Sequence, residues 1–250
     1  MKLQFKEQGF QIDAVRAVVD CFEGQSLKAN QFTLERSREL IRKAKLAAAG
    51  DYHVEQFDKV AFESSIYEEI GYRNSTLHIP ESQILKNIKN VQKRNDLLES
   101  EQIERPRGVK LGYNLTIEME TGTGKTYTYI RTMYELHKKY GWSKFIVIVP
   151  SIAIREGVYK SFQVTQDHFQ ELYGHKINPF IYNSGRPQDI ENFASDSRIS
   201  VMIINTQAFN ARGKDARRIY QELDQFGTRR PIEIISQTNP ILIIDEPQSV

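Results

Sequence analysis

Two short polar stretches of this sequence contain residue types suited to phosphate chemistry. In the first, ETGTGKT at 120–126, Gly122 and Gly124 precede Lys125 and Thr126. Glycine allows positive φ and lets an oxyanion approach backbone N–H groups, lysine brings a charge to phosphate oxygens, and a threonine hydroxyl can bind magnesium. The pattern predicts a P-loop for a magnesium-bound nucleotide. Its expected phosphate-binding members are Thr121, Gly122, Thr123, Gly124, Lys125 and Thr126.

The second stretch is DEPQ at 245–248, which follows four apolar residues. An aspartate there can hold Mg²⁺, and a neighbouring glutamate can orient and deprotonate the water that attacks the γ-phosphate. We therefore expect Asp245 to bind metal together with Thr126, and Glu246, Asp245 and Lys125 to be the catalytic residues. The alternative is a surface Asp-Glu pair at the end of a strand.

The elements around the P-loop follow from residue periodicity. Leu115, Ile117 and Met119 alternate with polar residues, which predicts a strand leading into the loop. Residues 125–140 contain no Gly or Pro and predict a helix whose unpaired first N–H groups face the glycines. The strict P-loop pattern has Gly at position 119, so this sequence matches the shorter Thr-Gly-x-Gly-Lys-Thr form. The alternative is an ordinary strand-to-helix turn with glycines.

Further apolar runs predict the sheet that would hold both motifs. Strands are expected at 145–149, 180–182, 199–204 and 241–244. A helix is expected after Pro150, with Ser151 as its N-cap. This alternation predicts an α/β fold with a mostly parallel sheet flanked by helices, and ligands gather at the carboxyl ends of such strands.

An amphipathic helix is expected at Gln11–Glu23, closed by Gly24. A glutamine amide complements the N6/N7 edge of adenine, so Gln11 near the P-loop could select ATP over GTP. Gln8 is an alternative reader, and Gln11 could equally be a solvated residue at a helix start.

Residues 25–106 are rich in charge and predict a helical insertion, with helices at 33–49, 57–70 and 82–100. The division expected is an adenine-reading helix at 1–24, this insertion, and an ATP-binding domain at 107–250. Four basic residues of the last insertion helix form its solvated face or, alternatively, contact DNA: Lys86, Lys89, Lys93 and Arg94.

Composition is that of a soluble globular protein: 40% of the residues are hydrophobic and 26% are charged. Cys21 is the only cysteine, which excludes an internal disulfide and a zinc cluster of cysteines. The first ten residues lack the apolar core of a signal peptide, and no apolar run reaches the length of a membrane span. We expect a cytoplasmic protein without membrane contact. The net charge of +2 does not by itself indicate a nucleic-acid partner.

Taken together, the motifs resemble the first motor domain of superfamily 2 helicases, and most closely the Res subunit of type III restriction enzymes. The resemblance rests on Gln11 with Ala14 and Val15, ETGTGKT at 120–126, VPSIAIREG at 149–157, INTQAF at 204–209 and DEPQ at 245–248. The VPSIAIREG stretch and the Pro-Gln after the acidic pair point to the type III branch. The similarity covers 110–250 and the first helix, and it implies a RecA-like P-loop NTPase domain.

By this resemblance, Gln11 reads adenine, the P-loop residues hold ATP, and the acidic pair binds Mg²⁺ and activates water. Ser151, Arg155, Thr206 and Gln207 would touch the DNA backbone, a role that hydroxyls, amides and helix N-termini can fill; each could equally be a cap or turn residue. A basic group could extend this DNA face or form a solvated loop: Arg212, Lys214, Arg217, Arg218, Arg229 and Arg230.

The resemblance implies an ATP-hydrolysing DNA motor of a restriction endonuclease, acting on double-stranded DNA beside a DNA methyltransferase partner. Relatives couple this domain to a second motor domain with an arginine finger and to a nuclease, and neither follows Val250. We therefore expect these 250 residues to bind ATP, hydrolyse it slowly and cleave no DNA alone. Two alternatives are another superfamily 2 helicase or translocase acting on DNA or RNA, and a nucleotide-binding remnant without catalysis.

Overall fold

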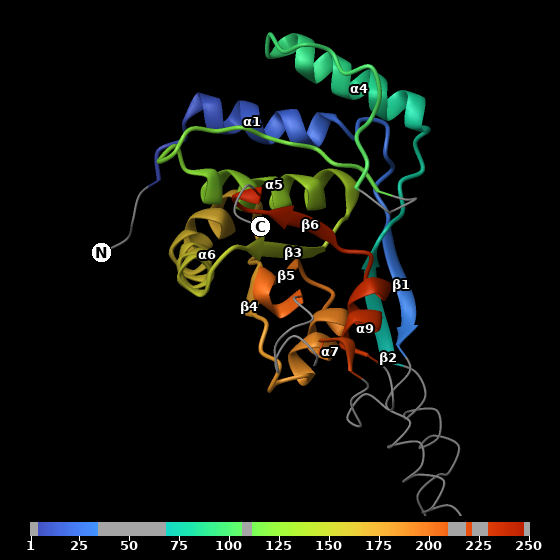
Figure 1. The fold of residues 1–250 in the computed structure, drawn as a ribbon, viewed down its shortest axis with the longest axis vertical. Coiled ribbons are helices and arrows are strands. Elements are labelled where there is room, and N and C mark those ends of the chain that lie inside the picture. Colours follow the sequence, from blue (N-terminus) through green and yellow to red (C-terminus); the bar gives the residue numbers. More distant parts are fainter. Residues whose placement is uncertain (1–4, 35–68, 107–111, 210–218, 222–229, 248–250) are drawn as a thin grey trace, which may run out of the picture. The chain divides into compact units, whose positions relative to one another are not determined.

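A computed structural model describes residues 5–34, 69–106, 112–209, 219–221 and 230–247 (Figure 1). The chain divides into two compact units. The first unit contains Met1–Lys28, Thr76–Trp142 and Gln163–His175, and the second unit contains Ala29–Ser75, Ser143–Phe162 and Lys176–Val250.

The second unit contains a four-stranded parallel sheet (Figure 1). Its order is β4-β5-β3-β6, formed by β3 (Lys144–Val149), β4 (Asn178–Ile181), β5 (Ser200–Asn205) and β6 (Ile241–Ile244). Each strand lies within one or two residues of its predicted position. The expected α/β class with a parallel sheet flanked by helices is therefore confirmed.

Burial explains why these apolar runs form strands. Every residue of β5 is buried, which is the environment of a strand covered on both faces in a parallel sheet. β6 pairs only with β3 among the described strands, and its exposed Leu242 and Ile244 alternate with half-buried Ile241 and Ile243. In the described structure, the side chains of β5 are therefore buried on both faces of the sheet, whereas those of the outer strand β6 are partly exposed.

Two helices that the sequence did not predict pack in the second unit. These are α7 (Gln188–Ser195) and α9 (Pro231–Gln237). Their buried side chains Ile190, Phe193 and Ile234 join a core with Met202 and Ile204 of β5. Both helices are short, so their apolar periodicity is too brief to stand out in the sequence.

The expectation of a helical insertion at 25–106 is wrong in part, because two strands lie in it. β1 (Ala29–Leu34) and β2 (Glu69–Asn74) form an antiparallel pair in the second unit. The predicted helices 33–49 and 57–70 lie mostly outside the described residues, and their described ends belong to these strands. Pairing between strand partners with 34 residues between them is a non-local contact that periodicity within either segment does not reveal.

Asn74, the last residue of β2, connects three parts of the second unit. Its Oδ1 accepts hydrogen bonds from the backbone N–H groups of Ser143 (2.7 Å) and Lys144 (2.9 Å), and its Nδ2 donates to the carbonyl oxygen of Lys144 at 2.7 Å. Its own N–H donates to the Thr238 carbonyl oxygen at 3.0 Å. Because Asn74 is buried, these bonds satisfy polar groups that water does not reach and attach β2 to the start of β3.

Lys144, the first residue of β3, is a fully buried lysine. Its Nζ donates to the carbonyl oxygens of Phe193 and Asp196, both at 2.5 Å. These carbonyls lie at the C-terminal end of α7, where a cation compensates unpaired acceptors and the helix dipole. Burial lowers the pKa of Lys144 from 10.5 to about 8, against the opposing effect of Asp196. The lysine therefore joins α7 to the sheet.

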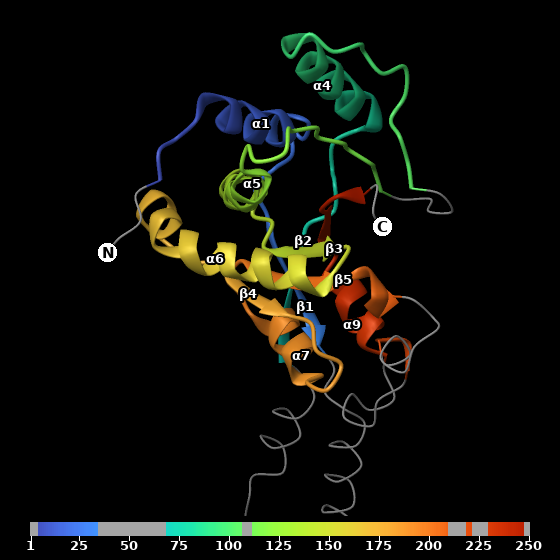
Figure 2. The ribbon, with the colours of Figure 1, turned by 60° about the vertical axis from the view of Figure 1, so that its left-hand side comes forward.

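The first unit is built from helices α1 (Gly9–Asp20), α4 (Glu81–Arg94) and α5 (Lys125–Tyr140), and Figure 2 shows α5 nearly end-on beside α1. α6 (Ile152–Tyr173) contributes its last eleven residues, 163–173, to this unit. The helices predicted at 11–23 and 125–140 are confirmed within a few residues, whereas the helix predicted at 82–100 ends six residues earlier, at Arg94. α5 ends where expected because Gly141 has φ 78°, a left-handed conformation that closes the helix.

The strand predicted at 115–119 is absent, which corrects the expectation that a strand leads into the P-loop. Within the described residues, 112–120 adopt no regular secondary structure, and Leu115 and Ile117 are exposed. Alternating apolar residues favour a strand only when a partner pairs the backbone and a second layer covers the apolar face. Neither condition is met in the described part of the chain.

None of the helices in the described ranges is both long and apolar enough to cross a membrane.

Candidate nucleotide and DNA site

The glycine-rich loop lies at the start of α5 in the first unit. Gly122 and Gly124 have φ values of 82° and 87°, in the left-handed region that glycine adopts without a steric penalty. A Cβ added to Gly122 would have no heavy atom within 4 Å, so the backbone there is open to a ligand. Thr123 closes a turn, because its Oγ1 donates to the Glu120 carbonyl oxygen at 2.6 Å.

The N-terminus of α5 suits an anion. Gly124 is the N-cap and has no side chain that could occupy the first N–H groups of the helix, and no acidic residue lies in the first turn. Lys125 and Thr126 are the first two residues of the 16-residue helix and are half-buried. Unpaired N–H groups, the positive dipole end and a lysine together form a donor set that fits a phosphate chain with its magnesium.

Gln11 reaches this loop. Its side-chain Nε2 donates a hydrogen bond to the Thr123 carbonyl oxygen at 2.8 Å, across 112 residues of sequence. The left-handed φ of Gly124 requires glycine, and a Cβ there would also lie 2.5 Å from the same Nε2, so the Gln11 side chain would have to move. The amide keeps a second N–H and its oxygen for another ligand. Gln11 thus lies beside the predicted P-loop, and its reading of adenine stays a prediction.

The remaining predicted residues belong to the second unit and follow the carboxyl ends of its parallel strands. In the register of the strands, Val149 pairs with Asn205, and Ile148 pairs with Ile244. The chain segments that follow β3, β5 and β6 therefore start level with one another. These segments carry Ser151 and Arg155, Thr206 and Gln207, and Asp245 and Glu246, respectively.

Ser151 and Arg155, two of the expected DNA-contacting residues, have local partners. Ser151 Oγ accepts a hydrogen bond from the Ile154 N–H at 3.3 Å, which makes Ser151 the predicted cap of α6. Arg155 Nη2 lies 3.0 Å from Glu156 Oε1. Thr206 and the exposed Gln207 begin a short 3₁₀ helix, η2 (Thr206–Phe209). Their DNA contacts stay a prediction.

The acidic pair follows β6 at the edge of the described sheet. The Asp245 N–H donates to the Ile148 carbonyl oxygen at 2.9 Å and so continues the pairing of β6 with β3. Glu246 is exposed and has φ 54°, a left-handed conformation that is uncommon outside glycine, asparagine and aspartate. Such strained positions cluster at functional sites, where the surrounding structure enforces them.

The structure thus brings together two sets of predicted residues, one in each unit. Gln11 and the P-loop form the first set, and the three strand-end motifs form the second. That the two sets act on one nucleotide stays a prediction. Of the basic group expected near DNA, Arg212, Lys214, Arg217, Arg218 and Arg229 lie outside the described residues, and Arg230 is the exposed N-cap of α9.

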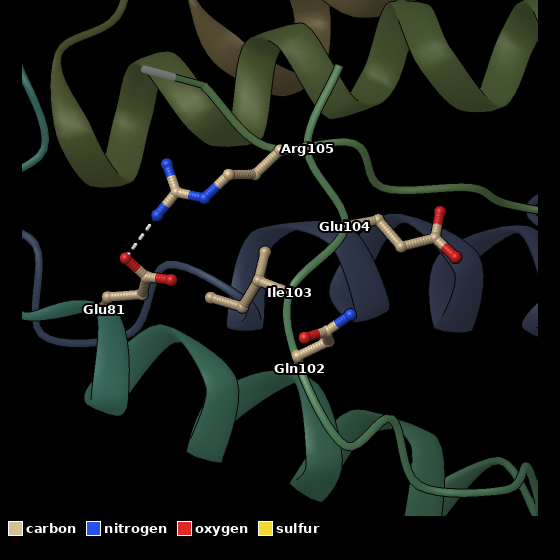
Figure 3. Close-up of a pocket in the computed structure, with 5 residues that line it drawn as sticks. All are labelled: Glu81, Gln102, Ile103, Glu104 and Arg105. Atoms are coloured by element: carbon tan, nitrogen blue, oxygen red, sulfur yellow. Dashed lines mark hydrogen bonds and ion pairs between the residues drawn. The ribbon is translucent and has the colours of Figure 1, made fainter. Parts of the chain in front are cut away.

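A pocket in the first unit lies away from these motifs in the sequence (Figure 3). Gln102, Ile103, Glu104 and Arg105 line it together with Glu81, the first residue of α4. Arg105 forms an ion pair with Glu81 and lies over the Tyr113 ring, 5.4 Å from its centroid. The ion pair and the ring contact join the start of α4 to Arg105 and Tyr113, which indicates a structural role for Glu81 and Arg105.

Comparison with known proteins decides the family. Residues 75–247, more than half of the chain, match the family model described as "Type III restriction enzyme, res subunit". The chain belongs to this family. The resemblance predicted from the motifs is thereby confirmed, and the match includes the P-loop and the acidic pair.

Three curated Res subunits show the extent of the similarity. The chain is 33% identical over 192 residues to the EcoP15I Res subunit of Escherichia coli, and 32% identical over 196 residues to the EcoPI Res subunit of Escherichia phage P1. Each alignment covers 70% of this chain and 19% of the relative. The StyLTI Res subunit of Salmonella typhimurium (strain LT2) is 37% identical over 152 residues, or 54% of this chain and 15% of that protein. The chain spans about a fifth of the length of the curated Res subunits that it matches.

Sequence reasoning missed several side chains of the Res-family chain that attach the segment before Gln11 to α5. Tyr127, directly after the P-loop, contacts Phe5 and His168, and Glu7 pairs with Arg131. Nothing in the local sequence marks these residues except that Phe5 and Glu7 precede Gln11 by a few positions.

Proposed function

We propose that this chain is an ATP-binding and ATP-hydrolysing motor domain of a type III restriction enzyme Res subunit. The observation that carries the proposal is the hydrogen bond from Gln11 to Thr123, made where two left-handed glycines open the start of α5. A base-reading amide and a phosphate cradle at one place are what recognition of ATP requires.

The chemistry is divided among named residues. Thr121–Thr126 and the α5 N-terminus hold the phosphates, and Gln11 reads adenine. Thr126 and Asp245 would hold Mg²⁺, which would neutralise the charge that develops on the phosphate oxygens. Glu246 orients the attacking water and accepts its proton, for which its exposed position at the end of β6 is suitable.

Ser151, Arg155, Thr206 and Gln207 are proposed to contact the phosphate backbone of double-stranded DNA. They follow the neighbouring strands β3 and β5 and offer hydroxyl, guanidinium and amide groups. Such contacts position DNA without reading its sequence. In the complete cytoplasmic enzyme, ATP hydrolysis would drive movement or switching on DNA that leads to cleavage, beside a methyltransferase subunit.

The first test is nucleotide binding by the 250-residue chain, measured by competition against a fluorescent ATP analogue with magnesium. Lys125→Ala should weaken Mg-ATP binding by about tenfold or more, because one charge on the β- and γ-phosphates is lost. Lys138→Ala, at the exposed far end of the same helix, is the matched control and should leave affinity unchanged. Equal affinity of wild type and Lys125→Ala would show that the loop does not hold phosphate.

The second test addresses hydrolysis in the complete subunit with its DNA. Glu246→Gln should keep Mg-ATP affinity and lose DNA-stimulated turnover, since an amide cannot accept the proton of water. Stimulation by RNA in place of double-stranded DNA would favour another superfamily 2 activity. Binding without any turnover dependent on Glu246 would favour a nucleotide-binding remnant.

A further inference from the structure

The segment that precedes Gln11 is attached to the P-loop helix at more than one point. Glu7 Oε1 lies 2.9 Å from Arg131 Nη1 on α5. The Phe5 ring stacks on Tyr127, with 6.0 Å between centroids and 23° between planes, and lies 5.0 Å from the His168 ring. Together with the bond from Gln11 to Thr123, these contacts fix residues 5–11 against the first two turns of α5.

Tyr127, on which Phe5 packs, is itself held in place by contacts with α6. Tyr127 lies in the first turn of α5, and its Oη is 2.9 Å from His168 Nε2 on α6. Its ring also packs on Phe169, at 5.0 Å between centroids, and Phe169 is fully buried. A side chain held by a hydrogen bond and by ring contacts on two sides gives Phe5 a fixed surface to pack on.

The first turn of α1 depends on this attachment for its position. Its N-cap Gln8 makes no side-chain capping bond within the described structure, and Phe10 is 51% exposed. The buried residues of α1, Val15 and Val19, lie one and two turns farther along. Apolar packing therefore holds the middle and end of α1, whereas Phe5 and Glu7 hold the end that carries Gln11.

Accurate placement matters for an amide that discriminates between bases. Glutamine has three rotatable side-chain bonds, and a hydrogen-bonding site rejects the wrong base only when its donor and acceptor are fixed. The phosphate cradle depends less on this placement, since its N–H groups and Lys125 belong to the loop and to α5 itself, and Gln11 contacts the loop through the Thr123 carbonyl and not through an N–H group.

We propose that Phe5 and Glu7, held by Tyr127, His168 and Arg131, are positioning residues that fix Gln11 for recognition of adenine, so that the preference for ATP over GTP depends on them. The inference rests on the proposed function, and it adds that base selection and triphosphate affinity are separable. All of these residues belong to the first unit.

The test compares three probes on the 250-residue chain: Mg-ATP, Mg-GTP and magnesium tripolyphosphate, which has no base. Dissociation constants come from competition with a fluorescent ATP analogue. In Glu7→Gln and in Phe5→Ala, the ratio of GTP to ATP dissociation constants should fall by about fivefold to tenfold, the scale of one hydrogen bond. Tripolyphosphate affinity should stay within about twofold of wild type, because the cradle is intact.

The matched control is Asp20→Asn, which removes a carboxylate at the other end of α1. Asp20 pairs with Arg94 at 2.9 Å, as Glu7 pairs with Arg131, but lies far along the helix from Gln11. Its three dissociation constants should equal those of wild type. Phe5→Leu, which keeps an apolar side chain, replaces Phe5→Ala if circular dichroism shows loss of helix.

Two results would overturn the inference while leaving the proposed function standing. One is an unchanged preference for ATP in Glu7→Gln and Phe5→Ala. The other is an equal loss of ATP and tripolyphosphate affinity, which would mean that the attachment holds the cradle and not the base reader. If wild type binds none of the three probes, the proposed function itself fails and the inference fails with it.

Discussion

Replacing Lys144 by methionine tests the energetics of the most unusual side chain in the second unit. Lys144 is fully buried, and its charge is held by two carbonyl oxygens at 2.5 Å. Burial lowers its pKa from the ordinary value of 10.5 to about 8. Between these two values the unfolded chain binds more protons than the folded protein, so the free energy of unfolding of the wild type rises with pH. The difference between the two pKa values corresponds to about 3 kcal/mol in the free energy of unfolding.

The measurement is urea unfolding of wild type and Lys144→Met at several pH values from 7 to 10.5, followed by circular dichroism. Tyrosines and other lysines titrate equally in both proteins, so only the difference between the two free energies is interpreted. Methionine loses the two hydrogen bonds and adds a pH-independent offset. Apart from that offset, the free energy of unfolding of the wild type should rise by up to about 3 kcal/mol relative to that of the variant as pH rises from 8.

The control is Lys160→Met on α6, whose side chain is exposed. Its difference from wild type should vary little with pH. Parallel curves for wild type and Lys144→Met would refute the reasoning, since they would mean that the buried ammonium binds its proton as tightly in the folded as in the unfolded state. A wild type that begins to lose stability relative to the variant as pH approaches 10.5 would mean that the two carbonyl contacts outweigh burial, because the folded-state pKa would then lie above the unfolded value.

Two further substitutions test local features of the fold by urea unfolding. Asn74→Ala should cost about 3 kcal/mol or more, because the Ser143 N–H and both backbone groups of Lys144 lose buried partners, whereas Asn178→Ala at an exposed position should cost less than about 1 kcal/mol. Gly157→Ala should stabilise by about 0.5–1 kcal/mol, since it lies within α6 and an added Cβ meets nothing within 4 Å. Gly174→Ala, just after the same helix, should destabilise, because Gly174 has φ 80°. Equal effects in either pair would contradict these assignments.

The sequence was most informative where local chemistry decides the structure. α5 begins at Lys125 and ends at Tyr140 as predicted, because left-handed glycines flank a run without Gly or Pro. The buried strands β3 and β5 were recognisable because β-branched residues follow one another without a polar break. The apolar runs before Asp245 and Thr206 are sufficient to predict that both residues follow strands, and the parallel register places them at the same end of the sheet.

Features that depend on distant partners could not be predicted in this way. The alternation at 115–119 is typical of a strand, yet the described structure offers it no paired neighbour. The roles of Asn74 and Lys144 arise from contacts with residues about 50 to 70 positions away. Asparagine and lysine are usually exposed, so neither residue type suggested burial. The contact of Phe5 with Tyr127 is likewise visible only in three dimensions.

Because the chain divides into two units, the proposed function predicts different effects for substitutions in each unit. Base reading and phosphate binding are assigned to residues of the first unit, whereas the acidic pair and the proposed DNA contacts belong to the second. Substitutions at Glu7 or Gly124 should therefore alter nucleotide binding. Substitution of Asn74, which anchors β2 to β3, should act through the stability of the sheet whose edge carries Asp245. Because β6 is bound to β3 through Ile148, loss of turnover in an Asn74 variant should be accompanied by a lowered unfolding midpoint, whereas loss of turnover in Glu246→Gln should not.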